Sequence, residues 1–463
     1  MLEQGRSSFA PDDSGRVLDR LAGLEQVISR EAVRQALMAT GRVGQRCCYL
    51  SHEVMLWIVL AMGIFTDLPI RQVFKHARRF RHAELSPHRS SLCLARQRLG
   101  VAPVRHLFET TVRPLAQPET PGAFYHGFRL VAIDGVIYNT PDTEANDRAF
   151  GRPSGGDRGM GAFPQIRKVS LVEVGTHVEI AVVFKRLACG ETTAVEGLWR
   201  HLPEDALLLE DRGFFSYKLW KRVLTENVAV LARVKSGLIL QPMENLSDGS
   251  YLAKIYPSWY DRQKDRNGVI VRVIRYRLDD PQRVGHEEEH VLMTTLLDEQ
   301  QYPASELISL YHERWEIELT YDEQKTHQDP RRATKPAHLR SETPAGVIQE
   351  LYALSLSHFV IRALMFEAAT AIDLDPDRLS FTGCFQILKC RLPECDHRTV
   401  ASLQDWYEAL QWEMQHETIV PRRNRINPRV IKQKISKWPK KQPEHRPAPT
   451  LTKTFQQSVV MIR

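Results

Sequence analysis

Residues 128–135 read FRLVAIDG, a short apolar run that ends on an acid and a glycine. Phe, Val and Ile are frequent in β-strands, so the run predicts a strand with Asp134 at its end. A second run, ALLLEDRGF at 206–214, predicts another strand that ends on Asp211. In an open α/β sheet, ligands gather near strand ends where the strand order reverses. The two aspartates are therefore candidate ligands of one site, or simple turn formers, since Asp favours strand ends.

The segments around these strands alternate as in an α/β domain. IRKVSLVEV (166–174) and THVEIAVVF (176–184) predict a hairpin that turns at Gly175. The order of elements predicts antiparallel strands first and parallel partners from βα units after them. The later elements are an amphipathic helix at 192–202, the strand at 206–214, a helix at 216–226 and a strand at 228–234.

A third acid lies in a predicted helix whose residues 311–325 read YHERWEIELTYDEQK. At 3.6 residues per turn, Tyr311, Arg314, Glu318 and Lys325 fall within about 60° of the helix surface. A carboxylate with cations on the same face suits a site that holds a metal ion and a phosphate together. The same spacing is found in ordinary solvated helices, where an Arg and a Glu four residues apart form a weak pair.

Asp134, Asp211 and Glu318 are the candidate metal ligands. Carboxylate oxygens are the donors that Mg²⁺ and Mn²⁺ prefer, and two such ions about 4 Å apart can activate an attacking oxygen and stabilise a leaving one. Glu210 and Asp142 are rival acids. Glu210 ranks lower because its side chain alternates to the opposite face of the strand from Asp211.

These segments resemble a known family. The order of elements is similar to the RNase H-like fold, an α/β fold. AIDG (132–135), EDRGF (210–214) and the Y-x2-R-x3-E-x6-K pattern of 311–325 resemble the catalytic pattern, with its DDE triad, of IS4-group insertion-sequence transposases. Further similar segments extend the resemblance over most of the chain: ARQRLGVAPVRHLFE (95–109), AIDGVIYNTPDTEANDRAFG (132–151), FPQIRKVSLVEV (163–174) and LRSETPAGVIQELYALSL (339–356).

The resemblance implies an active DNA transposase. Its site would nick the element end, form and open a DNA hairpin, and join the 3′ ends to target DNA, in a homodimer on paired ends. Glu342 departs from the family, whose members commonly carry a basic residue there. Two alternatives are a non-catalytic DNA-binding protein derived from a transposase and a structure-selective nuclease of the same fold. The implied ligands of two Mg²⁺ or Mn²⁺ ions are Asp134, Asp211 and Glu318, and the implied phosphate partners are Tyr311, Arg314 and Lys325.

Two further DNA contacts are predicted outside the triad. A hairpin requires a base out of the stack, and Trp259 in PSWYDRQ (257–263) is the candidate to hold it, although a small domain also needs core aromatics. The loop FGRPSGGDRGMGAF (150–163) does not join a strand to a helix as a nucleotide-binding loop does. It is predicted to contact DNA through Arg152 and Arg158.

The amino-acid composition limits the classes of protein to which the chain can belong. The 463 residues are 43% hydrophobic and 26% charged, fractions typical of soluble globular proteins. The longest apolar run, 54–65, is too short to span a bilayer and predicts a buried helix. The N-terminus has no signal-peptide core, and the 7 cysteines form no CxxC motif. A cytoplasmic, nucleoid-associated protein with reduced thiols is expected.

The positive charge is concentrated near the C-terminus. Net charge is +7, yet residues 421–446 hold ten Lys or Arg against one acid and carry +9. This basic, proline-containing tail predicts an extended segment and a polyanion partner, most simply DNA, with a solubilising end as the alternative. A second basic face is predicted in the N-terminal helical region, for DNA contact or solvation, from Arg78, Arg79, Arg81, Arg96 and Arg98.

The predicted organisation has seven parts. They are a disordered N-terminus (1–15), a helical DNA-binding domain (16–120), the first part of an RNase H-like core (121–234), an all-β insertion (235–302), the second part of the core with the catalytic helix (303–345), a helical region (346–416) and the basic tail (417–463).

Overall fold

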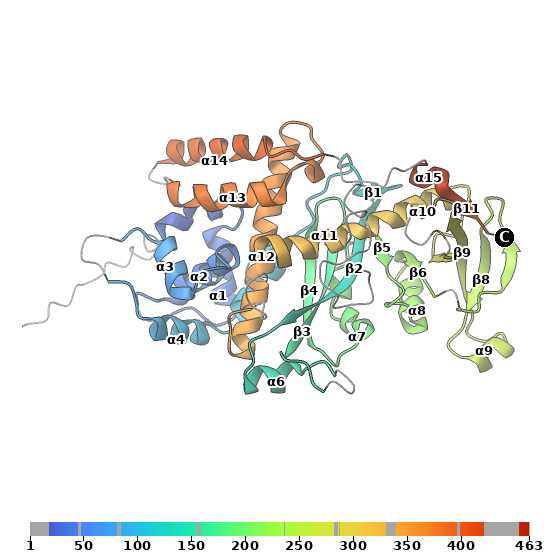
Figure 1. Ribbon diagram of the computed structural model, residues 1–463, viewed down its shortest axis with the longest axis horizontal. Coiled ribbons are helices and arrows are strands. Elements are labelled where there is room, and N and C mark those ends of the chain that lie inside the picture. The colour runs from blue at the N-terminus through green and yellow to red at the C-terminus, as the bar shows by residue number, and fades with distance from the viewer. Residues whose placement is uncertain are drawn as a thin grey trace, which may run out of the picture. The chain divides into compact units, whose positions relative to one another are not determined.

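The computed structural model describes residues 18–44, 48–80, 85–154, 159–235, 237–281, 286, 288–329, 339–395, 399–420 and 453–462. These residues form two compact units (Figure 1). The first unit holds the described residues up to Pro121, Gly135–His201 and Ile317–Val420. The second unit holds Gly122–Asp134, Leu202–Glu316 and the described C-terminal residues.

Helices of the first unit enclose an apolar core. α2 (His52–Ile64) begins at Ser51, whose Oγ accepts a hydrogen bond from Val54 N, and it is buried along most of its length, which confirms the predicted buried helix. α12 packs against α2 so closely that a side chain at Gly63 would collide with the Ala353 carbonyl. The other helices of this unit's core are 3-10 helix η2 (Asp19–Gln26), α1 (Arg30–Ala39), α3 (Ile70–Ala77), α4 (Arg89–Leu99), α5 (Ala102–Thr111), α13 (Phe381–Arg391) and α14 (Val400–Gln415).

Helix α12 (Pro344–Thr370) is long and apolar enough to cross a bilayer by length and composition. Of its most apolar window, 89% is buried inside the protein. Its neighbours in the first unit include α13 and α14 (Figure 1), and also α5. These contacts make α12 the central core helix of this unit, which explains its apolar composition.

The first unit also contains the predicted hairpin. β3 (Gln165–Glu173) and β4 (Val178–Arg186) pair antiparallel, and β3 lies between β4 and β2. The helix predicted over 192–202 is wrong in extent, since only α7 (Glu191–Val195) and a 3-10 turn at Trp199–His201 form. Gly197 lies between the two pieces, and glycine weakens a helix because it loses the most backbone freedom on ordering. Helix α6 (Glu144–Phe150), in the connection from β2 to β3, was not predicted.

Parallel strands build the centre of the second unit. β2 (Phe128–Asn139) pairs parallel with β5 (Ala206–Glu210), and β5 pairs parallel with β6 (Ala229–Arg233) through the connecting helix α8 (Tyr217–Thr225). The predicted parallel partners are confirmed. Strand β5 ends at Glu210, one residue before its predicted end at Asp211, and Asp211 begins a turn.

The insertion continues the sheet of the second unit. Within this unit the strand order is β2-β5-β6-β10-β9-β8-β7, with β10 antiparallel to β6. Besides strands, the segment predicted as all-β contains the short helix α9 (Trp259–Gln263). The strands are β7 (Pro242–Asn245), β8 (Tyr251–Ile255), β9 (Val269–Leu278) and β10 (His290–Thr294).

The described C-terminal residues belong to the second unit. β11 (Val459–Met461) pairs antiparallel with β9, and the ring of Phe455 in α15 (Phe455–Ser458) stacks on His312, with 4.2 Å between ring centroids. The sequence did not predict this strand or this contact. The basic segment 421–446, whose extended conformation was predicted, lies outside the described residues.

The helix predicted to begin near Ser305 is composed of four pieces. α10 (Ala304–His312) leads into a 3-10 turn, η5 (Glu313–Trp315), then α11 (Glu316–Asp322) and a π-helix, η6 (Glu323–Gln328). Both 3-10 and π segments change the rotation per residue from the α-helical value. The projection of residues 311–325 onto one uniform α-helix is therefore wrong.

Candidate active site

Two acids lie next to each other, one within β2 and one just after β5. Ile133 of β2 is the register partner of Glu210 of β5, so Asp134 lies within β2 at the level of Asp211, which directly follows β5. The prediction that Asp134 ends its strand is wrong, because β2 continues to Asn139. Neighbouring strands lie about 4.8 Å apart, and side chains at matching positions project from the same face of the sheet. Both aspartates are partly exposed. The second unit thus offers a pair of solvent-accessible carboxylates.

Tyr311 and Arg314 contact the same part of the sheet. The Tyr311 hydroxyl donates a hydrogen bond to the backbone oxygen of Glu210 at 3.1 Å. Arg314 forms an ion pair with Asp134, with 3.9 Å between Nη1 and Oδ2, and its side chain is 6% exposed. Burial raises the pKa of Tyr311, so its hydroxyl remains a hydrogen-bond donor at neutral pH. A buried cation therefore lies beside one of the paired carboxylates.

Lys325 contacts β2 within the first unit. Its Nζ donates a hydrogen bond to the Ile137 oxygen at 2.9 Å and lies 5.2 Å from the centroid of the Tyr138 ring. Ile137 is three residues after Asp134 along the strand. Glu318 is an exposed residue of α11, four residues after Arg314. The strand register thus places Asp134 beside Asp211. Glu318 belongs to the other unit.

The rival acid Glu210 is buried. Its side chain is 0% exposed, and neither carboxyl oxygen has a hydrogen-bond partner among the described residues. Burial raises the pKa of Glu210 to about 8. Strand alternation explains the difference between Glu210, which faces the interior, and the partly exposed Asp211.

Changing Glu210 to Gln is expected to remove a pH-dependent loss of stability. The folded protein holds the Glu210 proton up to about pH 8, whereas the unfolded chain releases it near the ordinary glutamate pKa of 4.5. Wild-type stability should therefore fall between these pH values, at up to about 1.4 kcal/mol per pH unit from this group. Urea unfolding of both proteins from pH 5 to 9 with a chelator measures the effect, and equal pH slopes would contradict it.

Arg152 braces the loop in which it was predicted to contact DNA. Its guanidinium pairs with Asp142 and with Asp147, the latter at 3.0 Å, and donates to the Ala162 oxygen at 2.7 Å. Asp142, the other rival acid, is therefore the ion-pair partner of Arg152. The DNA contact of Arg152 stays a prediction, and Arg158 lies outside the described residues.

The arginines of the predicted basic face of the N-terminal helices differ in their contacts. Arg96 donates hydrogen bonds to Gln349 Oε1 at 2.9 Å and to the Gly346 oxygen at 2.6 Å, both from α12. The prediction that Arg96 is part of a plain solvated face is therefore wrong, and its contact with DNA stays a prediction. Arg79 donates to the Pro393 oxygen at 3.1 Å, whereas Arg98 is exposed. Arg78 lies over the Tyr49 ring, and Arg81 is outside the described residues.

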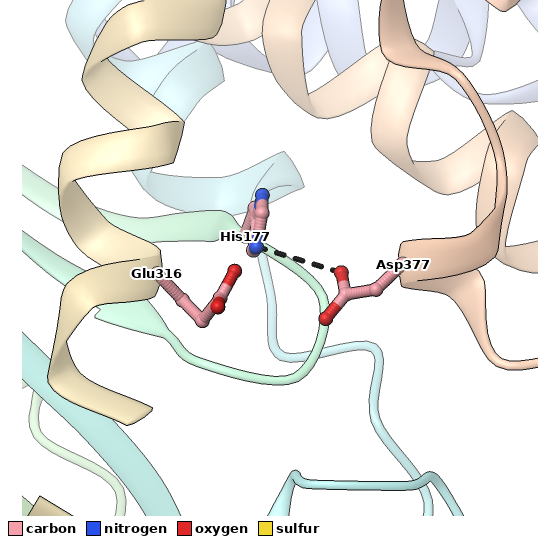
Figure 2. A group of neighbouring side chains, drawn as sticks. All are labelled: His177, Glu316 and Asp377. Atoms are coloured by element: carbon pink, nitrogen blue, oxygen red, sulfur yellow. Dashed lines mark ion pairs between the residues drawn. The ribbon is translucent and has the colours of Figure 1, made fainter. Parts of the chain in front are cut away.

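A buried His177–Asp377 ion pair in the first unit offers two metal-ligand types (Figure 2). The distance from His177 Nε2 to Asp377 Oδ1 is 3.5 Å, and His177 Nδ1 lies 3.1 Å from Glu323 Oε1. Arg362 pairs with Glu323 and adds a fixed positive charge beside them. Both ring nitrogens thus have charged neighbours, which identifies a structural ion network. Glu316, also drawn in Figure 2, belongs to the second unit.

Trp259 is an exposed residue of the insertion. Helix α9 begins at Ser258, whose Oγ accepts from Asp261 N at 3.1 Å, and none of its residues is buried. Trp259 is 71% exposed and Tyr260 56% exposed, and Lys264 Nζ lies 4.4 Å from the Tyr260 ring centroid. The alternative that Trp259 is a core aromatic is therefore wrong, and a free indole stands next to an aromatic–cation pair.

Comparisons with known proteins give two matching families and two similar proteins. Residues 18–109 match the family described as insertion element 4 transposase N-terminal, and residues 125–356 match the transposase DDE domain. The chain is 29% identical to "Transposase InsG for insertion sequence element IS4" of Escherichia coli (strain K12) over 432 residues, 90% of this chain and 93% of the relative. It is 25% identical to "Putative transposase InsZ" of the same organism over 233 residues, 47% of this chain and 77% of the relative.

Proposed function

Since the chain belongs to the IS4 family of DDE transposases, we propose that it moves an insertion sequence by cleaving the element ends and joining them to target DNA. A DDE transposase domain has an RNase H-like fold, acts on DNA and uses divalent metal ions. The cut-and-paste route, the hairpin intermediate and the identity of the metal as Mg²⁺ or Mn²⁺ are parts of our proposal.

The observation that carries the proposal is the placement of Asp134, within β2, beside Asp211, just after β5, with Arg314 next to Asp134. Two exposed carboxylates on adjacent strands form a donor set that suits hard cations. Together with Glu318 they would hold two divalent ions. When bound, such ions lower the pKa of the attacking water or 3′-hydroxyl and stabilise the leaving 3′-oxygen.

The cationic side chains of residues 311–325, Arg314 and Lys325, have a role different from that of the carboxylates. A phosphate brought to Asp134 would meet the guanidinium of Arg314, which has its remaining donors in a rigid planar fork. Lys325, at the end of β2, would add a point charge for a neighbouring phosphate. Tyr311 would hold the helix to the strand end through its hydrogen bond to the Glu210 oxygen. These charges orient the scissile phosphate, and no covalent protein intermediate is required.

Trp259 is proposed to hold the base that leaves the stack when the hairpin forms. Its exposure leaves the indole face available for stacking, which contributes about 1–3 kcal/mol per base in nucleic-acid complexes. Changing Trp259 to Ala should lower the rate of hairpin formation roughly 10-fold or more, with the first nick unaffected. Denaturing gels of single-turnover reactions separate the two products.

Trp412→Ala is the matched control for this prediction. Trp412 is 61% exposed and lies in α14 of the first unit. It should form hairpins at the wild-type rate. A Trp259→Ala protein with full hairpin yield would remove Trp259 from the mechanism.

A homodimer on paired element ends is also part of the proposal. Joining both ends to one target requires two active sites close together, and the chain supplies one set of Asp134, Asp211 and Glu318. Analytical ultracentrifugation with end DNA should give two chains and two duplexes per complex. A stable complex of one chain with one duplex that completes joining would contradict this stoichiometry.

The function is tested with purified protein, a labelled duplex that carries the terminal inverted repeat, a target plasmid, and Mg²⁺ or Mn²⁺. We expect metal-dependent cleavage at the repeat boundary, a hairpin, and joined products, none of them formed by Asp211→Ala. Cleavage without joining would favour the structure-selective nuclease. Binding without cleavage in either metal would favour the non-catalytic DNA-binding protein.

A further inference from the structure

The π-helix that carries Lys325 has buried polar side chains. Such segments are rare, and their backbone hydrogen bonds run from residue i to i+5. Within η6, Glu323 is 3% exposed, and Gln324 and Gln328 are 0% exposed. Burial of a polar group costs free energy unless it is hydrogen-bonded, so the partners of these side chains determine whether the π-turn is stable.

Gln324 is hydrogen-bonded through both ends of its amide. Oε1 accepts from Lys168 Nζ at 2.8 Å and from the Tyr138 hydroxyl at 3.2 Å, and Nε2 donates to Glu179 Oε2 at 2.5 Å. Lys168 also pairs with Glu179 at 2.7 Å and donates to Ser355 Oγ at 2.9 Å. All these residues belong to the first unit. The amide is therefore fixed by residues of three strands, β2, β3 and β4.

Tyr138 connects this cluster to Lys325. The Tyr138 hydroxyl donates to Gln324, while the ring of the same tyrosine lies under the Lys325 ammonium, 5.2 Å from its Nζ. Lys325 Nζ also donates to the oxygen of Ile137, the residue before Tyr138. Two consecutive residues of η6 thus hold two consecutive residues of β2. A change in the rotation of the π-turn would move both contacts together.

The other buried polar residues of η6 hold the turn at its ends. Glu323 accepts from Arg362 Nε at 3.0 Å and lies 2.9 Å from His358 Nε2. Gln328 donates to the Gly63 oxygen at 3.0 Å. These contacts join η6 to α12 and α2, elements of the apolar core. Neither side chain shares a partner with Lys325 in these contacts, so their role is in folding.

We propose that Gln324 is a positioning residue of the transposition reaction, which together with Lys168 and Tyr138 sets the π-turn so that the Lys325 ammonium stays at the end of β2 to meet a DNA phosphate. The proposal rests on the phosphate role given to Lys325 above. Gln324 does not touch DNA. It acts through the orientation of Lys325, and its removal leaves the charge of Lys325 intact.

The test is a double-mutant cycle between Gln324→Met and Lys325→Ala in the full chain. Met keeps the volume of Gln and removes its hydrogen bonds. We expect Gln324→Met to slow single-turnover cleavage roughly 10- to 100-fold, since small displacements of a positioned group have effects of this size. The dissociation constant for end DNA should change less than about twofold. In the Lys325→Ala background, Gln324→Met should cause no further loss, because the group it orients is gone.

Two matched variants separate positioning from folding. Gln349→Met changes another buried glutamine of the first unit, which donates to the Arg96 and Gly100 oxygens, and it should leave cleavage unchanged. Tyr138→Phe removes only the hydroxyl that reaches Gln324 and keeps the ring under Lys325. It should slow cleavage in wild-type protein but not in Lys325→Ala. Circular dichroism melting verifies that each variant is folded.

Two outcomes would overturn the proposal, and they are distinguishable. If Gln324→Met slows Lys325→Ala by the same factor as wild type, Gln324 supports the fold and not the orientation of Lys325. If Lys325→Ala cleaves at the wild-type rate while Asp211→Ala is inactive, the phosphate role of Lys325 fails although the transposase function stands.

Discussion

Changing Asp134 to Asn should lower the single-turnover rate of strand cleavage by at least about 10³-fold. The amide has the size of the carboxylate but not its charge, so the pair formed with Asp211 loses a donor for hard cations. Binding to the terminal repeat should persist, because that affinity comes mainly from phosphate contacts elsewhere. Gel-based cleavage assays and fluorescence anisotropy on the same duplex measure the two quantities.

Asp142→Asn is the control for this experiment. Asp142 is a rival acid near Asp134 in sequence, and its carboxylate pairs with Arg152. We expect it to keep cleavage within about threefold of wild type, as surface pairs contribute little. An active Asp134→Asn protein would show that Asp134 and Asp211 do not form the reactive site. An inactive Asp142→Asn protein would move the site toward the loop at 150–163.

Changing Arg314 to Ala is expected to reduce cleavage roughly 10²- to 10³-fold, the effect of removing one preorganised donor from a charged transition state. Arg314 is 5% exposed, so no neighbouring surface cation can replace it without repacking. Changing Arg314 to Lys instead should restore little of the cleavage rate, because an ammonium lacks the planar fork of a guanidinium. The measurement is the single-turnover rate at saturating protein.

Arg233→Ala is the matched arginine of the same unit, on β6, where it pairs with Glu288 at 3.5 Å. It should cleave at close to the wild-type rate. Full activity of Arg314→Lys would contradict a bidentate phosphate role. Loss of folding in Arg314→Ala, seen as a lower melting temperature with no native transition, would instead assign Arg314 to the support of Asp134.

The sequence predicted the parts of the fold that local pattern determines. The apolar runs at 128–135 and 206–214 are rich in strand-forming residues, and they form the parallel neighbours β2 and β5. The end of β2 was not predicted, since the strand continues to Asn139. Strand periodicity also ranked Glu210 correctly below Asp211, since the side chain of Glu210 is buried. The hairpin at 165–186 followed from its β-branched residues and its central turn.

The parts that were missed depend on contacts distant in sequence. Arg96 looked like a surface charge, and only the approach of α12 shows that it bonds to Gln349. The π-turn at Glu323–Gln328 follows from buried partners on β3, β4 and α12, none of which a helical projection includes. The strand β11 forms by pairing with β9, about 180 residues earlier in the chain.

The C-terminal docking adds a further element to the second unit. Phe455 stacks on His312, the residue after Tyr311, and Lys453 pairs with Asp279 at 3.0 Å. The sequence contained a signal for it, namely the short apolar run around Val459–Met461 after a long basic segment. A three-residue run is too short to predict a strand without its partner.

The most direct test of the account uses DNA whose scissile 3′-oxygen is replaced by sulfur. If Asp134, Asp211 and Glu318 hold divalent ions against the leaving group, cleavage of this DNA should be lost in Mg²⁺ and restored in Mn²⁺, which accepts sulfur more readily. Normal DNA should be cleaved in both metals, and Asp211→Ala should cleave neither substrate. Equal loss in Mg²⁺ and Mn²⁺, or equal cleavage in both, would contradict a metal contact to the leaving oxygen.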